Sequence, residues 1–156
     1  MTNNPPAVID ADAFTVRRTI HIDAPIDTVW RAITEPALIS QWFGDAAFEA
    51  LAVGARGTLS WPDYGAAPVR IEAIDEPRSI SDRWADGAEY PGIPDVDTVP
   101  STVFTFTLES VESGTRLTVV ETGFETTRAP EENLESHRGG WDFELDELVA
   151  LLEAAA

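Results

Sequence analysis

The sequence predicts an α+β fold in which a curved antiparallel sheet of about seven strands wraps around a long C-terminal helix. Three patterns lead to this prediction: segments of alternating apolar and polar residues fill the middle of the chain, two short amphipathic segments follow the first of them, and one long amphipathic segment ends the chain. The expected order is one strand, two short helices, six strands and one long helix. At 156 residues the chain fits one domain, expected over residues 14–156.

The first strand is expected soon after the N-terminus. Residues 1–13 show no periodicity and are expected to form a flexible leader. From Phe14 to Ile22 apolar residues alternate with polar ones, which is typical of a half-buried strand. Arg18 is the exception, because the alternation places its charged side chain on the apolar face.

Two short helices are expected next. Pro25 is suited to a first helical turn, and apolar residues then recur at helical spacing at Ile26, Val29, Trp30 and Ile33. A second helix is expected to begin at Pro36. Its apolar stripe includes Trp42 and ends at Gly44, a residue type that often terminates helices.

Six further strands are expected between residues 46 and 124. Turn residues separate the runs 48–53, 57–61, 69–74, 80–84, 102–109 and 116–121. Strands so closely spaced pair with their neighbours, which predicts an antiparallel meander. The segment 85–100 is rich in Pro and Gly, and is expected to be a mobile loop, with a functional lid as the alternative.

The last helix is expected to be long and one-sided. One face carries Leu134, His137, Trp141, Leu145, Leu148 and Leu152. The pair Gly139-Gly140 within it disfavours a helix by roughly 1 kcal/mol per glycine relative to alanine. Close approach to the sheet, a kink, or a helix that begins only after the pair would each account for it.

Charge and composition exclude several classes of partner and chemistry. The net charge is -18, and all ten cationic side chains are Arg. Such a chain repels phosphate backbones and anionic lipids, so neither nucleic acid nor membrane insertion is expected. The absence of Cys excludes disulfides, thiolate metal sites and cysteine nucleophiles. No signal segment or apolar run of about 20 residues is present, so a cytoplasmic protein is expected.

Four pieces of sequence carry a family resemblance. They are Ala24-Pro25 followed by residues 29–34, Pro36 followed by Trp42-Phe43, residues 113–118 leading to Gly123-Phe124, and Gly139-Gly140-Trp141 leading to Leu145 and Leu148. In this order they resemble the SRPBCC superfamily, whose helix-grip fold is shared by START lipid-transfer domains, pollen-allergen proteins and polyketide cyclases. More narrowly, the chain resembles bacterial homologues of the activator of heat-shock protein 90 ATPase. The resemblance implies the fold more firmly than an activity.

The concave face of the expected sheet is the candidate binding site. Its residues are Leu59, Trp61, Ile80, Trp84, Phe104, Phe106, Leu117 and Val119 on the strands, with Trp42, Trp141 and Leu145 on the helices. Aromatic walls with few polar anchors favour a pocket for a small hydrophobic or aromatic molecule. The alternative is that these side chains fill the interior themselves.

Strand alternation also turns three charged side chains inward, namely Arg18, Asp82 and Glu121. Buried charges require partners, so the three are expected either to neutralise one another or to hold a polar group of a ligand. His137 is expected to be a hydrogen-bonded residue near the helix start, with a general acid or base as the alternative. No metal or cofactor is expected, because no second His lies at ligand spacing and phosphate-loop motifs are absent.

The leading functional prediction is a non-enzymatic protein that binds a small hydrophobic or aromatic molecule. One alternative is a chaperone modulator, which the family resemblance implies. Another is a cyclase- or hydrolase-like enzyme that uses Asp82, Glu121 or His137 as acid or base. A chaperone and a second copy of the chain are kept as alternative partners.

Overall fold

The computed structural model describes residues 4–62, 65–85 and 92–154. Within them, one antiparallel sheet has the strand order β1-β2-β8-β7-β6-β5-β4-β3. The elements in chain order are β1 (Val8–Asp10), β2 (Thr15–Ile22), α1 (Ile26–Thr34), α2 (Pro36–Ile39), β3 (Asp45–Phe48), β4 (Arg56–Trp61), β5 (Gly65–Asp75), β6 (Ser79–Ala85), the 3-10 turn η1 (Val96–Thr98), β7 (Ser101–Val111), β8 (Gly114–Thr122), the 3-10 turn η2 (Phe124–Thr126) and α3 (Pro130–Ala154).

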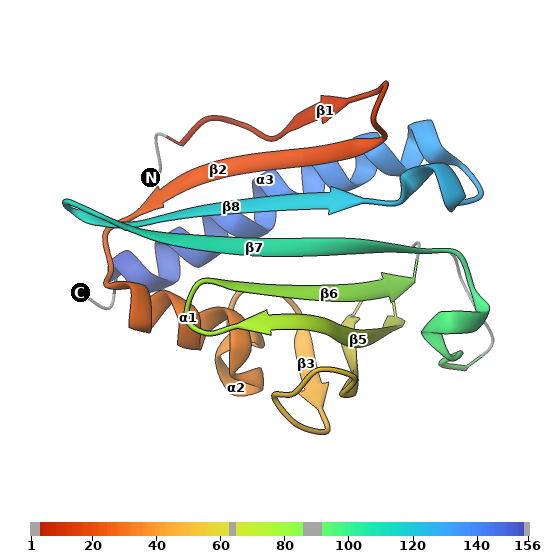
Figure 1. Cartoon of the computed structure of the whole chain (residues 1–156), viewed down its shortest axis with the longest axis horizontal. Helices are drawn as coiled ribbons and strands as arrows, with labels where there is room; N and C mark the ends of the chain where they lie inside the picture. Colours follow the sequence, from red (N-terminus) through yellow and green to blue (C-terminus); the bar gives the residue numbers. More distant parts are fainter. Residues whose placement is uncertain (1–3, 63–64, 86–91, 155–156) are drawn as a thin grey trace.

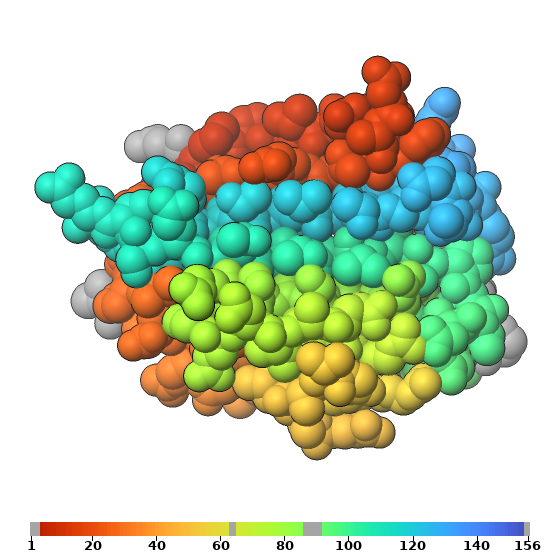
Figure 2. Space-filling model, viewed as in Figure 1, coloured from red at the N-terminus to blue at the C-terminus, as the bar shows by residue number. Residues whose placement is uncertain are grey.

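The predicted fold class is confirmed. Strands β3 to β8 follow one another across the sheet as a six-strand meander, and β2 completes it beside β8. Figure 1 shows α3 lying lengthwise behind the sheet, with α1 and α2 near its C-terminal end. The other face of the sheet forms the side of the molecule seen in Figure 2. The apolar core therefore lies between the sheet and the three helices.

The N-terminal segment differs from the expected flexible leader over residues 4–13. Val8–Asp10 form β1, the additional strand, which pairs with β2. The Asn4 side chain bonds both the N–H and the C=O of His21, at 2.8 and 3.0 Å. The Ala7 N–H donates to Asp142 Oδ1 at 2.6 Å. The hydrogen bonds of Asn4 and Ala7 join residues more than ten positions apart, so local periodicity could not predict them.

Two strand boundaries also differ from prediction. The expected strand over 48–53 is instead the end of β3 and a loop, residues 49–55, which we call the rim loop. The loop turns at Gly54, whose φ of 88° suits glycine and whose N–H donates to Ile71 O at 2.8 Å. Strand β5 begins at Gly65, within the segment ending at Pro68 that was expected to be a turn. The strand tolerates Pro68 because its pairing with β6 starts only at Val69, so the missing N–H of the proline interrupts no hydrogen bond to β6.

Helix α3 runs without a break through Gly139 and Gly140. A Cβ added at either glycine would meet nothing within 4 Å, so neither a late helix start nor close approach to the sheet accounts for the pair. Directly after the glycine pair, Arg18 on β2 connects the helix to the sheet. Its guanidinium donates to the carbonyl oxygens of Trp141 and Asp142 at 3.2 and 3.1 Å.

Candidate functional site

The aromatic side chains predicted to line the concave face contact one another in the interior. Neighbouring ring centroids lie 4.8 to 6.3 Å apart among these candidates and Phe43, which the prediction did not include; the candidates are Trp42, Trp61, Trp84, Phe104, Phe106 and Trp141. The aliphatic candidates are buried with them, at Leu59, Leu117, Val119 and Leu145. These side chains therefore pack against one another in the interior, between the sheet and α3.

Glu121 on β8 lies among these rings and accepts hydrogen bonds from four side chains. Trp84 Nε1 and Thr102 Oγ1 donate to Oε2 at 2.8 and 2.5 Å. Trp141 Nε1 donates to Oε1 at 2.8 Å, and His137 Nδ1 lies 2.9 Å from both oxygens. We call Glu121 with these four donors the Glu121 cluster. It joins β6, β7 and β8 to α3.

The Glu121 cluster stabilises a charge that burial alone would neutralise. Glu121 has no exposed surface, and burial raises its pKa, but the opposing charge of His137 and the hydrogen bonds outweigh burial and leave the pKa lowered. The His137 ring meets Phe124 edge-on at 5.1 Å and Trp84 at 5.7 Å. His137 is thus a hydrogen-bonded residue in the first half of α3, as predicted from the sequence.

Arg18 and Asp82 both point inward, as the alternation predicts, yet the three charges are not brought together. Arg18 is 3% exposed and donates to Asp146 Oδ1 at 2.8 Å and to Pro5 O at 2.9 Å. Asp82 lies opposite Phe104, which in turn lies opposite Glu121, so the two carboxylates share one row of the sheet. Two strand spacings put about 10 Å between their backbones. The buried Phe104 ring lies between them.

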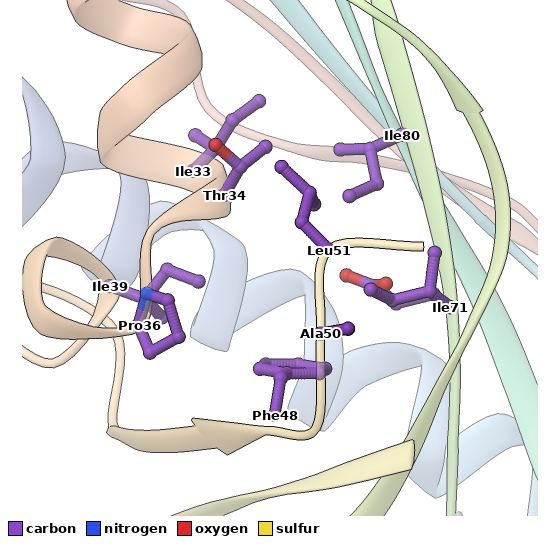
Figure 3. Close-up of a pocket in the computed structure, with 10 residues that line it drawn as sticks. Ile33, Thr34, Pro36, Ile39, Phe48, Ala50, Leu51, Ile71 and Ile80 are labelled. Atoms are coloured by element: carbon purple, nitrogen blue, oxygen red, sulfur yellow. The ribbon is translucent and has the colours of Figure 1, made fainter. Parts of the chain in front are cut away.

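A cavity of about 170 Å³ lies on the Asp82 side of this row. Helices α1 and α2, the rim loop and strands β3, β5 and β6 enclose it, and its wall consists of Ile33, Thr34, Pro36, Ile39, Phe48, Ala50, Leu51, Ile71, Ile80 and Asp82. Figure 3 shows Ile33 and Thr34 facing Ile71 and Ile80 across it, with Leu51 reaching between them. Ala50 and Leu51 are exposed, so the rim loop forms the edge of the cavity toward solvent.

Asp82 is the one charged residue on this wall. It is 7% exposed, and its Oδ1 has no hydrogen-bond partner among the described residues. Burial, and secondly the negative charge of Glu72, raise its pKa to about 7. The neighbouring cations face elsewhere, because Arg70 and Arg83 hold Glu72 at 3.0 and 2.8 Å. Asp82 therefore sits at the border of ionisation in an apolar wall.

Comparison with known proteins identifies the family. The model of the family described as "Activator of Hsp90 ATPase homolog 1-like protein" (AHSA1) matches residues 23–153. The chain belongs to this family. A search of curated proteins found no match to this AHSA1-like chain.

Solved structures share the AHSA1-like fold. Protein MLL2253 from Mesorhizobium loti is 27% identical, with a TM-score of 0.77 over 91% of this chain and 98% of that one. CalU16 from Micromonospora echinospora is 26% identical, with a TM-score of 0.67 over 88% and 73%. DynU16, described as a putative protein in the dynemicin biosynthetic locus, is 24% identical, with a TM-score of 0.73 over 90% and 48%.

This cavity overlaps only in part with the site predicted from the sequence of this AHSA1-like protein. Of the predicted site residues, Ile80 and Asp82 line it. The other wall residues come from α1, α2, β3, β5 and the rim loop, which sequence reasoning missed. The available signal was the apolar residue Leu51, which was assigned to a strand and lies on the cavity wall.

Two further findings concern only the parts of the chain that the structure describes. There, no cluster of three or more His, Asp or Glu side chains could hold a metal ion. None of the helices is long and apolar enough to cross a membrane.

The predicted loop over 85–100 lies partly outside the described residues, at 86–91. Beyond them, Asp97 of η1 forms an ion pair with Arg70.

Proposed function

We propose that this AHSA1-like protein binds a small, largely apolar molecule in the cavity between α1, α2, the rim loop and strands β5 and β6. The observation that carries the proposal is an apolar cavity with one buried, incompletely partnered carboxylate on its wall. Binding sites combine apolar walls with few polar anchors in this way. We place the ligand here rather than among the aromatic rings, because the rings contact one another.

The cavity volume sets the size of the ligand. An apolar cavity of about 150 Å³ holds one benzene molecule. A volume of about 170 Å³ therefore accommodates one ring or a short branched chain. Larger ligands require the rim loop to move, and Leu51, which reaches into the cavity from that loop, is the side chain they would displace.

Asp82 gives a second reason to assign function to this cavity. A buried carboxylate without a full set of partners disfavours folding, and residues that break such a rule without structural benefit are enriched at functional sites. Leucine or isoleucine would suit the other wall residues better. The position is explained if the carboxylate contacts a ligand.

Thermal denaturation against one-ring hydrocarbons and their amine and alcohol derivatives tests the proposal. Ala50→Phe places a large side chain at the edge of the cavity, and Val53→Phe, in the same loop but off the cavity wall, is the matched control. We expect some compounds to raise the unfolding midpoint of the wild type and of Val53→Phe but not of Ala50→Phe. A panel with no effect, or equal effects on all three proteins, would refute ligand binding at this cavity.

Chaperone modulation remains the second candidate, because the family is described as homologous to an activator of Hsp90 ATPase. Its test is the ATP turnover of a bacterial Hsp90 with and without the protein. An unchanged turnover together with no co-purification would count against it. A joint catalytic role for Asp82, Glu121 and His137 has less support, because Phe104 lies between Asp82 and the other two.

A further inference from the structure

The polar groups on the cavity wall restrict the chemistry of the ligand beyond its size. Nine of the ten wall residues carry no charge, and eight of those nine are apolar. The remaining one, Thr34, donates its hydroxyl proton to Trp30 O at 2.7 Å, so its oxygen is left as an acceptor. Asp82, whose pKa is raised to about 7, is in its ionised form also an acceptor only, whereas its protonated form donates one hydrogen bond. A ligand of the ionised form must therefore supply hydrogen-bond donors.

Charge narrows the class further. Glu72 near Asp82 is already paired with Arg70 and Arg83, so the uncompensated charge at the cavity is that of Asp82, on a chain whose net charge is -18. Anionic ligands are repelled by both, whereas small cations are attracted and concentrated near the surface. A neutral donor would satisfy a hydrogen bond and leave the buried charge of Asp82 uncompensated. A cationic donor would satisfy the hydrogen bond and also compensate the charge of Asp82.

Resting on the proposed function, we infer that the natural ligand is a compact apolar monoamine, with its ammonium group against Asp82 and its hydrocarbon part between Ile33, Ile71 and Ile80. The ammonium group offers three donors, enough for the free Asp82 oxygen and a second acceptor. The remainder of the molecule fits a space suited to one ring or a branched chain of similar volume. Ketones, esters and carboxylic acids of the same size lack the required donor or carry the wrong charge.

Matched ligand pairs test this inference by calorimetry at moderate salt and about pH 8, where both the amines and Asp82 are charged. Suitable pairs are benzylamine with toluene, cyclohexylamine with methylcyclohexane, and isopentylamine with isopentane, with benzyl alcohol and benzoate as further probes. At least one amine should bind the wild type tenfold or more tightly than its hydrocarbon partner. In Asp82→Leu the preference should disappear while the hydrocarbon still binds. In Ala50→Phe, whose charge is unchanged, neither should bind.

The outcomes separate the two proposals. Equal affinity within every pair, or an amine preference that survives in Asp82→Leu, would overturn the amine assignment while cavity binding stands. Tighter binding of benzyl alcohol than benzylamine would assign the site to a neutral donor and would also overturn it. Binding of amines that Ala50→Phe leaves intact would place them on the acidic surface. No binding by any compound would reject both the amine and the cavity.

Discussion

Two buried carboxylates in one row of the sheet differ in their hydrogen-bond partners. Glu121 accepts hydrogen bonds from four side chains and faces His137, whereas Asp82, on the other side of Phe104, has an oxygen without a partner among the described residues. The pKa of Glu121 is lowered, and that of Asp82 is raised to about 7. Both are buried, so burial alone does not decide the charge state. The supply of donors does, and it separates a structural carboxylate from a candidate ligand anchor.

The two pKa shifts act on stability in different pH ranges. Glu121 releases its proton more easily in the folded state than in the unfolded state, so its contribution is present above its unfolded pKa of 4.5 and is lost as pH falls through the lower folded value. Asp82 holds its proton more tightly when folded. Stability therefore falls as pH rises between 3.8 and about 7, and the unfavourable charge is fully present above that range.

The largest change in stability is expected from Glu121→Ala. The substitution removes the acceptor of the two indoles, Thr102 and His137 at once, and breaking such a buried network destabilises by about 3–5 kcal/mol. Urea unfolding at neutral pH measures it. The control is Glu109→Ala, which removes an exposed carboxylate paired with Arg116 and should change stability by less than about 1 kcal/mol. Similar values for both variants would contradict the structural role of the Glu121 cluster.

The next largest change in stability should be a gain rather than a loss. Asp82→Leu replaces a buried charge with an apolar side chain and should stabilise the protein above about pH 7, by about 1–4 kcal/mol. The gain should shrink as pH falls toward 4, because the folded wild type then holds Asp82 protonated. Urea unfolding of both proteins over this pH range gives the difference. A loss of stability at high pH would mean that Asp82 has a structural partner, and the contrast with Glu121 would fail.

Strand alternation was sufficient to place the charged residues but not to pair them. The period of two is a local property, and it correctly turned Arg18, Asp82 and Glu121 inward. Their partners are set by the path of α3, as with Arg18, whose contacts at Trp141 and Asp142 lie more than 100 residues away in the chain. No pattern in the sequence of β2 carries that information.

The cavity was missed for a different reason. Phe48 and the apolar residues after it have the composition of a strand, but the chain leaves the ladder after Phe48 and turns at Gly54. Leu51 therefore reaches the cavity from a loop rather than from the concave face of the sheet. The aromatic candidates were correctly predicted to be inward, yet only their packed volumes decide whether space remains between them.

A smaller loss is expected for His137→Gln. The amide keeps a donor for Glu121 but removes the charge, so stability at neutral pH should fall by about 1–2 kcal/mol. The pKa of Glu121 should rise toward that of an ordinary buried carboxyl, because the opposing charge of His137 is the largest of the effects that lower it. Acid unfolding followed by circular dichroism should then begin at higher pH than in the wild type. An unchanged acid transition would show that the neutral donors suffice.

The smallest effect is expected for Glu72→Gln, which removes the second cause of the raised Asp82 pKa and leaves the first, burial. We expect the pKa of Asp82 to fall by less than about one unit, because Glu72 lies near the surface, where charges are screened. The stability difference between Glu72→Gln and Glu72→Gln/Asp82→Leu, followed against pH, reports this pKa, and the single Asp82→Leu variant against the wild type gives the reference near 7. A midpoint that stays above 5 assigns the contrast between the two carboxylates to missing donors. A midpoint near 4 would assign it to Glu72, and Asp82 would then need no ligand to explain its state.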